Sequence, residues 1–453
     1  MAEFLPLIMF AAICLVLLAG YPVAFTLAGV SLLFAFMGSI FNLFDPALLG
    51  ALPSRIYGTM TNVTLIAVPL FVLMGVTLEK SKIAEELLEN MAKVFGGIRG
   101  GLAFSVVIVG TLLAASTGIV GATVVTMGLM ALPVMLKQNY SPALSTGTIA
   151  ATGTLGQIIP PSIALVLLGD ILSTAYQGAQ ISQGIFNPKT VSVGDLFIGA
   201  MVPGILLVSL YLIYLISIAV FSKESMQQTR TQTTIEILPL LKGLLPPVLL
   251  IVLVLGSILT GAATPTEAAG VGAFSALCLA AFRRQLDWSQ LKDITRSSLK
   301  ITSMVFLILI GATVFSLVFR GYGGDELVHS LFVDMPGGKY GALLVVMLAI
   351  FLLGFILDFI EITFVVVPIV APVLLVMGFD PIWLGIMIAV NLQTSFLTPP
   401  FGFALFYLRG VAPNSVATQT IYRGVLPFIV IQLALLVMMA VWPEMVTWLP
   451  DTL

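Results

Sequence analysis

Two helix-breaking stretches limit what this chain can fold into more than any other feature. They cover residues 153–162 and 394–402, and each lies inside an apolar run long enough to cross a bilayer. Each contains a double proline: Pro160 and Pro161 in the first, Pro399 and Pro400 in the second. Proline lacks the N–H that an intact helix needs, and it disfavours helical dihedrals in the residue before it. Each run is therefore predicted to form two half-helices joined by unwound backbone, which membranes tolerate only inside protein or along a cavity.

The two stretches belong to a longer internal correspondence. Pro160 and Pro399 are 239 positions apart, and the same offset relates Pro133 to Pro372. Paired interruptions at matching positions of two halves point to the binding site in secondary transporters. We therefore predict an inverted duplication. It consists of a first repeat, a linker and a second repeat, over residues 1–222, 223–235 and 236–453.

Composition is typical of a polytopic helical membrane protein. Of the 453 residues, 59% are apolar and only 9% are charged, against about a quarter charged in soluble domains. The net charge of −2, with no basic run, gives no reason to expect a nucleic-acid partner. The expected surroundings are a lipid bilayer, and the expected fold is all-α, with about 20 mostly apolar residues in each span.

Each predicted repeat contains the same series of segments. Three spans come first, and a charged amphipathic arm helix follows. An apolar pair, a broken span and a final span come next. The arms cover 79–93 and 321–335, the pairs cover 101–136 and 340–377, and the broken spans cover 143–172 and 382–410. Because each half of a pair has only about 16–18 residues, the pair is either a re-entrant hairpin or two spans, and we favour the re-entrant form.

The orientation follows from counting five crossings in each repeat. The two repeats then have opposite orientations, and the 19 Lys and Arg residues divide 15 to 4 between the two sides. The positive-inside rule assigns the richer side to the cytoplasm. Both termini are thus expected on the outer, periplasmic side, with the first hairpin entering from inside and the second from outside.

Ionisable groups inside the membrane are costly and therefore candidates for function, and three acidic residues stand out. Asp358 and Glu361 lie at the predicted tip of the second hairpin, where carboxylates can help to bind a cation. The alternative is that they occupy an interfacial turn or brace a helix end. Glu267 follows Thr264-Pro265-Thr266, which is typical of a helix N-terminus, so a structural role is favoured for it.

Small and oxygen-bearing residues gather at the first hairpin tip and beside the double prolines. They are Ser116, Thr117 and Gly118 at the tip, Thr152, Gly153 and Thr154 in the first broken span, and Asn391, Thr394 and Thr398 in the second. Unwound carbonyls and helix C-terminal ends can coordinate Na⁺, while half-helix N-termini attract a carboxylate. For any single hydroxyl, helix-to-helix hydrogen bonding is the alternative. As a cluster they predict a substrate and ion site, with Na⁺ at Ser116, Gly153, Asp358 and Thr394.

The sequence gives little support for an enzyme. His329 is the only histidine, and the nucleotide-binding pattern Gly-x-x-x-x-Gly-Lys-Ser/Thr does not occur. The chain is therefore expected to be a transporter without a cofactor. Its energy must come from an ion gradient or from a partner protein.

The motifs resemble the large membrane subunit of tripartite ATP-independent periplasmic (TRAP) transporters, of the DctM type. The resemblance covers essentially the whole chain and rests on residues 20–25, 116–123, 153–162, 264–269 and 391–402, in this order. It implies a bacterial or archaeal inner-membrane permease that works with a small membrane subunit and a periplasmic substrate-binding protein. It also implies Na⁺-coupled uptake of an organic acid, such as a dicarboxylate, a 2-keto acid or a sugar acid. The hairpins and broken helices would move as an elevator against a scaffold of the other spans.

Three other functions stay open. A stand-alone ion-coupled carboxylate carrier would have the same hairpin plan without a binding protein. A channel lines its pore with rings of repeated subunits or charges, whereas the repeat predicted here is internal and inverted. The permease of an ATP-driven importer would need an ATPase partner. Neighbouring genes for a binding protein and a small membrane subunit would favour the TRAP system.

Overall fold

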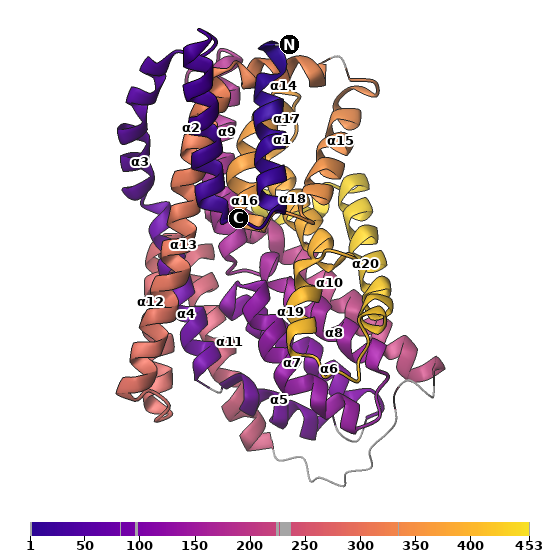
Figure 1. Cartoon of the computed structure of the whole chain (residues 1–453). Coiled ribbons are helices and arrows are strands. Elements are labelled where there is room, and N and C mark those ends of the chain that lie inside the picture. Colours follow the sequence, from indigo (N-terminus) through magenta and orange to yellow (C-terminus); the bar gives the residue numbers. More distant parts are fainter. Residues whose placement is uncertain are drawn as a thin grey trace.

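The computed structural model of the chain describes residues 2–81, 83–95, 98–222, 226, 237–333 and 335–452, and the regular elements in them are all helical (Figure 1). The helices up to residue 222 are α1 (Leu5–Leu18), α2 (Val23–Ile40), α3 (Leu52–Met60), α4 (Ala67–Lys80), α5 (Ile83–Val94), α6 (Gly101–Thr117), α7 (Val120–Lys137), α8 (Pro142–Thr154), α9 (Ile163–Ser182) and α10 (Val193–Phe221). The 3₁₀ turns are η1 (Ala2–Phe4), η2 (Pro46–Ala51), η3 (Thr64–Ile66) and η4 (Leu155–Gln157). The later helices are α11 (Ile237–Leu259), α12 (Pro265–Phe282), α13 (Trp288–Gly321), α14 (Gly324–Val333), α15 (Gly338–Leu353), α16 (Phe359–Glu361), the π-helix η5 (Ile362–Val366), α17 (Val367–Val376), α18 (Pro381–Leu397), α19 (Phe403–Val411), α20 (Thr418–Val441) and α21 (Glu444–Thr452).

Membrane-spanning helices dominate the described residues. Seven helices are long and apolar enough to cross a membrane, and there are up to eight spans if the bent pair Pro46–Met60 and Thr64–Lys80 forms one crossing. Phe25, Phe274 and Val430 on these helices are large, apolar and mostly exposed. Such side chains suit contact with lipid tails, which are as apolar as they are. The chain is thus an all-helical, multi-pass membrane protein.

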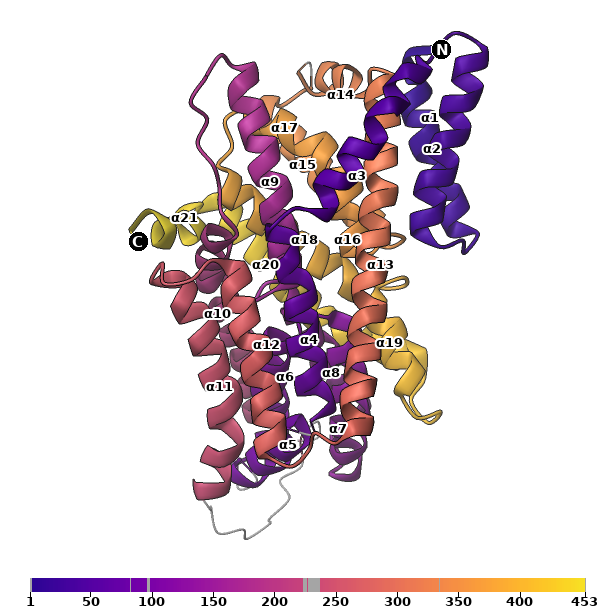
Figure 2. The same ribbon diagram turned by 90° about the vertical axis from the view of Figure 1, so that its left-hand side faces the viewer.

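The two arm helices lie at opposite ends of the molecule. In both views α5 is at the lower end, called here the α5 end, and α14 is at the upper end, the α14 end (Figure 1, Figure 2). Helices α6 and α7 occupy the half near the α5 end, whereas α15 and α17 occupy the other half. Helix α13, with 34 residues, extends between the two ends. The division of the chain into two inverted repeats stays a prediction.

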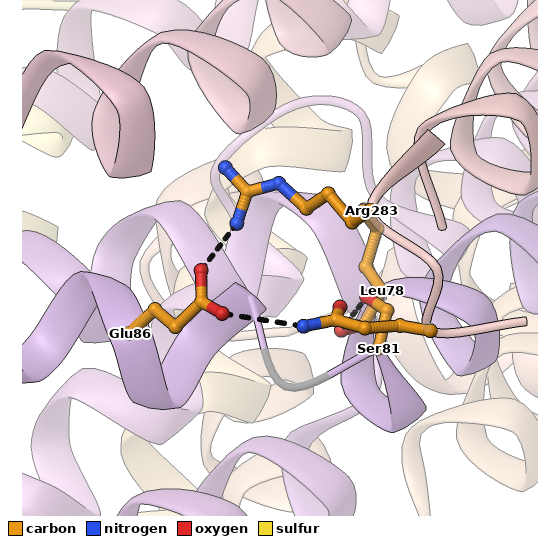
Figure 3. A network of polar contacts seen from close by, with 5 residues as sticks. Leu78, Ser81, Glu86 and Arg283 are labelled. Carbon is orange, nitrogen blue, oxygen red and sulfur yellow. Dashed lines mark hydrogen bonds and ion pairs between the residues drawn. The ribbon is translucent and has the colours of Figure 1, made fainter. Parts of the chain in front are cut away.

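Each arm helix is held by an ion pair. On α5, the Glu86 carboxylate accepts from Arg283 Nη1 at 2.6 Å and from Gln285 Nε2 at 3.2 Å (Figure 3). Arg283 and Gln285 follow the end of α12, so this contact joins distant parts of the chain. On α14, Asp325 Oδ2 pairs with Arg320 Nε at 3.1 Å, and Arg320 belongs to the last turn of α13. The α14 arm is therefore held by the helix directly before it.

Several helix bounds differ from those expected from hydropathy. The apolar part of α13 covers residues 298–319, but the helix begins at Trp288, where Asp287 Oδ1 accepts from the Gln290 backbone N–H at 2.6 Å. Its first turns are polar, so a search for apolar spans does not detect them. The same reason explains why α3, which is short and mostly exposed, was not expected. The predicted linker, 223–235, lies outside the described residues except for Met226.

The start of α12 confirms the structural role predicted for Glu267. Its carboxylate accepts from the Thr264 backbone N–H at 2.8 Å, and the Thr264 hydroxyl accepts from the Glu267 N–H at 3.3 Å. This reciprocal capping box satisfies two backbone donors that a helix N-terminus leaves without partners. Glu267 is therefore used by its own helix.

Candidate functional site

Both double prolines lie where a helix is interrupted. Helix α8 ends at Thr154 and continues as the single turn η4, and α9 begins only at Ile163, after Pro160 and Pro161. Helix α18 ends at Leu397 and α19 begins at Phe403, after Pro399 and Pro400. Each interruption therefore contains backbone outside regular helix, of the kind that binds ligands in secondary transporters.

The first hairpin tip packs against the first interruption. Helix α6 ends at Gly118, whose φ of +62° is a left-handed conformation that glycine adopts without strain. A Cβ added at Gly118 would lie 3.2 Å from the backbone nitrogen of Ile163, the first residue of α9. The Thr117 and Thr123 hydroxyls are hydrogen-bonded at 2.8 Å across the turn, and Ser116 donates to the Leu112 carbonyl. The tip therefore offers hydroxyl and carbonyl oxygens beside the start of a half-helix.

The first broken helix contacts the same hairpin along its length. A Cβ at Gly110 on α6 would lie 2.9 Å from the Thr152 side chain, and one at Gly153 would lie 2.2 Å from that of Val124 on α7. Thr152 and Thr154 donate to carbonyls of their own helix. Their oxygens keep lone pairs, but their hydrogens are used locally, as expected of helical threonines.

The second tip carries two carboxylates that are engaged in starting a helix. Asp358 Oδ1 accepts from the Phe359 backbone N–H at 2.7 Å, and Glu361 Oε2 accepts from the Asp358 N–H at 3.1 Å. These bonds form a capping box at α16. Asp358 and Glu361 therefore brace a helix end, which was the alternative to cation binding. Glu361 is only 6% exposed. Each carboxylate still has one oxygen outside this box.

The second broken helix is bonded to the second hairpin. Asn391 Nδ2 donates to the Met347 carbonyl at 2.7 Å, and the Ser395 hydroxyl donates to the Phe351 carbonyl at 2.7 Å. Thr394 and Thr398, in contrast, donate to carbonyls one turn earlier in the α18 chain. These four polar residues at the end of α18 thus divide into two that bond to α15 and two that bond to their own backbone.

The two hairpins pack against the interrupted helices. The turn η4 packs against α18, and α9 packs against α16 and η5 at the second tip. No group of three or more His, Cys, Asp or Glu side chains suited to a metal occurs in the described residues. A hard cation held here would therefore rely on carbonyl, hydroxyl and amide oxygens together with at most two carboxylates. Na⁺ is compatible with such a set.

One buried amide beside the first interruption was not predicted. Gln157, in η4, is 1% exposed, and among the described residues neither its Oε1 nor its Nε2 has a hydrogen-bond partner. A buried amide without a protein partner is costly, and this one lies beside the first interruption. The signal was present in the sequence as a polar residue three positions before a double proline in an apolar run.

Two cavities lined by both polar and apolar side chains lie beside this centre and share Asp170. One, of about 350 Å³, lies between α3, α9, α13 and the η5–α17 segment and is lined by Arg55, Asn62 and Asp170 among others. The second, of about 410 Å³, lies between α9 and the starts of α10 and α12. Neither Arg55 nor Asp170 was predicted to belong to a site. Asp170 lies inside the expected broken span 143–172, so the rule that intramembrane charges mark function would have found it.

Comparisons with known proteins agree on one family. The chain matches the family described as "Tripartite ATP-independent periplasmic transporter, DctM component" over residues 9–445. It is 32% identical to the C4-dicarboxylate TRAP transporter large permease protein DctM of Pseudomonas aeruginosa, over 91% of this chain and 92% of that protein. The sialic acid TRAP transporter large permease SiaM of Vibrio cholerae is 27% identical, with 96% of each chain covered. The ectoine/5-hydroxyectoine permease UehC of Ruegeria pomeroyi is 28% identical, with 98% of each covered.

Two solved structures share the fold. The YdaH transporter of Alcanivorax borkumensis superposes with a TM-score of 0.64 at 16% identity, covering 98% of this chain and 99% of that one. MtrF of Neisseria gonorrhoeae has a TM-score of 0.59 at 14% identity, covering 87% and 83%. At such identities the likeness concerns the fold alone.

Proposed function

We propose that this chain, which belongs to the DctM component family of tripartite ATP-independent periplasmic transporters, imports an organic acid anion by coupling its uptake to Na⁺. Like its relatives, it is a transporter permease and not an enzyme. The observation that carries the proposal is the meeting of two hairpin tips with two interrupted helices. Interrupted helices bring carbonyl ends and N–H ends to one place, where they can hold a cation and an anion together.

The Na⁺ ions are proposed to bind at the two tips. On the first side the ligands would come from Ser116 and from the carbonyls near Gly153. On the second side they would come from Thr394 and from the carboxylate oxygen of Asp358 that is outside the capping box. These groups are oxygen donors on irregular backbone or at helix ends, which suits a weakly held hard cation.

The movement is proposed to be an elevator in an inverted repeat. The first repeat is 1–222 and the second is 236–453, with the arms α5 and α14 at opposite ends in support of the inversion. The mobile part would contain the hairpins 101–136 and 340–377 and the broken helices 143–172 and 382–410. Both hairpins would be re-entrant, since α6 with α7 and α15 with α17 each stay in one half of the molecule.

The setting is proposed to be the bacterial inner membrane. The partners would be a small membrane subunit and a periplasmic binding protein that delivers the solute, as the word "tripartite" in the family description suggests. Both chain termini would face the periplasm, and the α5 end would face the cytoplasm, because 15 of 19 basic residues were assigned to that side. The stand-alone carrier is not favoured, because the named relatives are TRAP permeases.

The test is uptake of labelled organic acids into proteoliposomes that contain this chain, its small subunit and its binding protein. A Na⁺ gradient should drive accumulation, while ATP alone should not. Uptake that persists without the binding protein would support a stand-alone carrier instead. Uptake that ignores Na⁺ and does not saturate would indicate a channel.

A further inference from the structure

We infer that the cavity between α3, α9, α13 and the η5–α17 segment recognises a solute with a carboxylate at one end and an N–H donor at the other. The inference rests on the proposed function, because it names the solute class that the transporter takes. The cavity measures about 350 Å³, which suits a small organic acid. It adjoins the second hairpin tip, since Phe364 of η5 lines it.

The guanidinium of Arg55 forms the end of the site that binds the carboxylate of the solute. Arg55 is half-buried and lines the cavity. In the part of the chain that the structure describes, it forms neither an ion pair within 4.0 Å nor a side-chain hydrogen bond. Its charged neighbours Arg320 and Asp325 are paired with each other at 3.1 Å, so they largely cancel. A planar guanidinium with free donors is suited to bidentate binding of a carboxylate.

The carboxylate of Asp170 forms the other end of the site, which accepts from the N–H donor of the solute. Its Oδ1 accepts from Asn62 Nδ2 at 2.9 Å, and the Asn62 amide is itself oriented because its Oδ1 accepts from the Thr64 N–H at 2.9 Å. Among the described residues no partner reaches Asp170 Oδ2. One oxygen is thus held in place, and the other can accept from a ligand.

The charge balance of the cavity selects against a second carboxylate. Arg55 and Asp170 are the ionisable residues that line it, and they have opposite charges. A dicarboxylate would bring its second negative group towards Asp170, where like charges repel. An ammonium, amidinium or amide N–H at that end would instead donate to Oδ2. Thr59, Thr174, Thr313 and Ser316 add hydroxyl groups to a lining that is otherwise apolar apart from Arg55, Asn62 and Asp170.

The test measures ligand-induced thermal stabilisation of the purified full chain in detergent, with ectoine as the zwitterionic probe and succinate as the dicarboxylate. A ligand that binds only the folded state raises the melting temperature with its concentration. Ectoine should stabilise the wild type at lower concentrations than succinate. Arg55→Met should raise the half-maximal ectoine concentration by about tenfold or more, as expected for loss of a charge-assisted contact, and Arg55→Lys should raise it less.

Asp170→Asn gives the decisive readout, because the amide preserves the contact with Asn62 but removes the negative charge. It should weaken the binding of ectoine and strengthen the binding of succinate. The difference between the half-maximal concentrations of the two probes should therefore become smaller or change sign. Lys189→Met, a basic residue outside the cavity lining, is the control and should change neither probe. An unchanged preference in Asp170→Asn, or no Arg55-dependent stabilisation by either probe, would overturn the inference. Because neither a Na⁺ gradient nor a partner is used, such a failure leaves the proposed uptake function to its own test.

Discussion

The two hairpin tips, which we propose to be related by the inverted repeat, differ in chemistry. The first is uncharged and closes on a left-handed Gly118 with a hydrogen bond between two threonine hydroxyls. The second has no such glycine turn and contains two carboxylates in a capping box, after which the helix widens into a π-turn. The turn at Gly118 needs space for the backbone to approach closely, whereas the turn at Asp358 and Glu361 needs their negative charges to accept backbone hydrogen bonds. Substitutions of each kind should therefore affect one tip and spare the other.

The largest effect is expected from Gly118→Val at the first tip. A β-branched residue at φ +62° is strained, and its Cβ would press on the backbone of Ile163, so we expect a loss of roughly 2 kcal/mol or more in stability. The melting temperature in detergent and Na⁺-driven uptake should both fall. The matched control is Gly184→Val, where φ is +81° but no atom lies within 4 Å of the added Cβ. Equal losses in the two variants would show that the close approach at the tip has no importance.

A second effect is expected from Asp358→Ala at the charged tip. It removes a helix cap, at a cost of about 1 kcal/mol, and it also removes the proposed Na⁺ ligand. The control is Asp380→Ala, which removes the cap of α18, where Asp380 Oδ1 accepts from the Trp383 N–H at 2.8 Å. Melting temperatures should fall similarly in both. Only Asp358→Ala should raise the Na⁺ concentration for half-maximal uptake, and an equal Na⁺ response in both would leave Asp358 with a capping role alone.

The tips also show what the sequence could predict. The helix interruptions were predictable because proline acts on the local backbone. The capping role of Asp358 was left open, although Asp358-Phe359-Ile360-Glu361 has the spacing of a capping box. The cavity of Arg55 and Asp170 was not predictable, because it depends on which helices pack together. Arg55 lies on α3, a polar helix that hydropathy does not detect.

A smaller effect is expected from Thr117→Val, which removes the hydroxyl bond across the first tip. Such bonds within membranes contribute about 0.6 kcal/mol, so the melting temperature should change little. Thr148→Val is the control, because Thr148 is also buried but donates only to the Leu144 carbonyl of its own helix. If the Thr117 oxygen helps to hold Na⁺, only Thr117→Val should weaken the Na⁺ dependence of uptake. The same weakening in Thr148→Val would assign the effect to general packing.

The smallest effect is expected at the arms, where the comparison of the two halves continues. Glu86→Gln removes an ion pair between α5 and the segment after α12, whereas Asp325→Asn removes one between neighbouring turns of α13 and α14. Both pairs are partly exposed, so each contributes about 0.2–1 kcal/mol, and less at high salt. Because only Glu86 ties together distant parts of the chain, Glu86→Gln should also change the rate of uptake, while Asp325→Asn should change stability alone. Uptake rates measured at low and high salt decide this: a rate that falls equally in both variants would mean that the two arms restrain the protein in the same way.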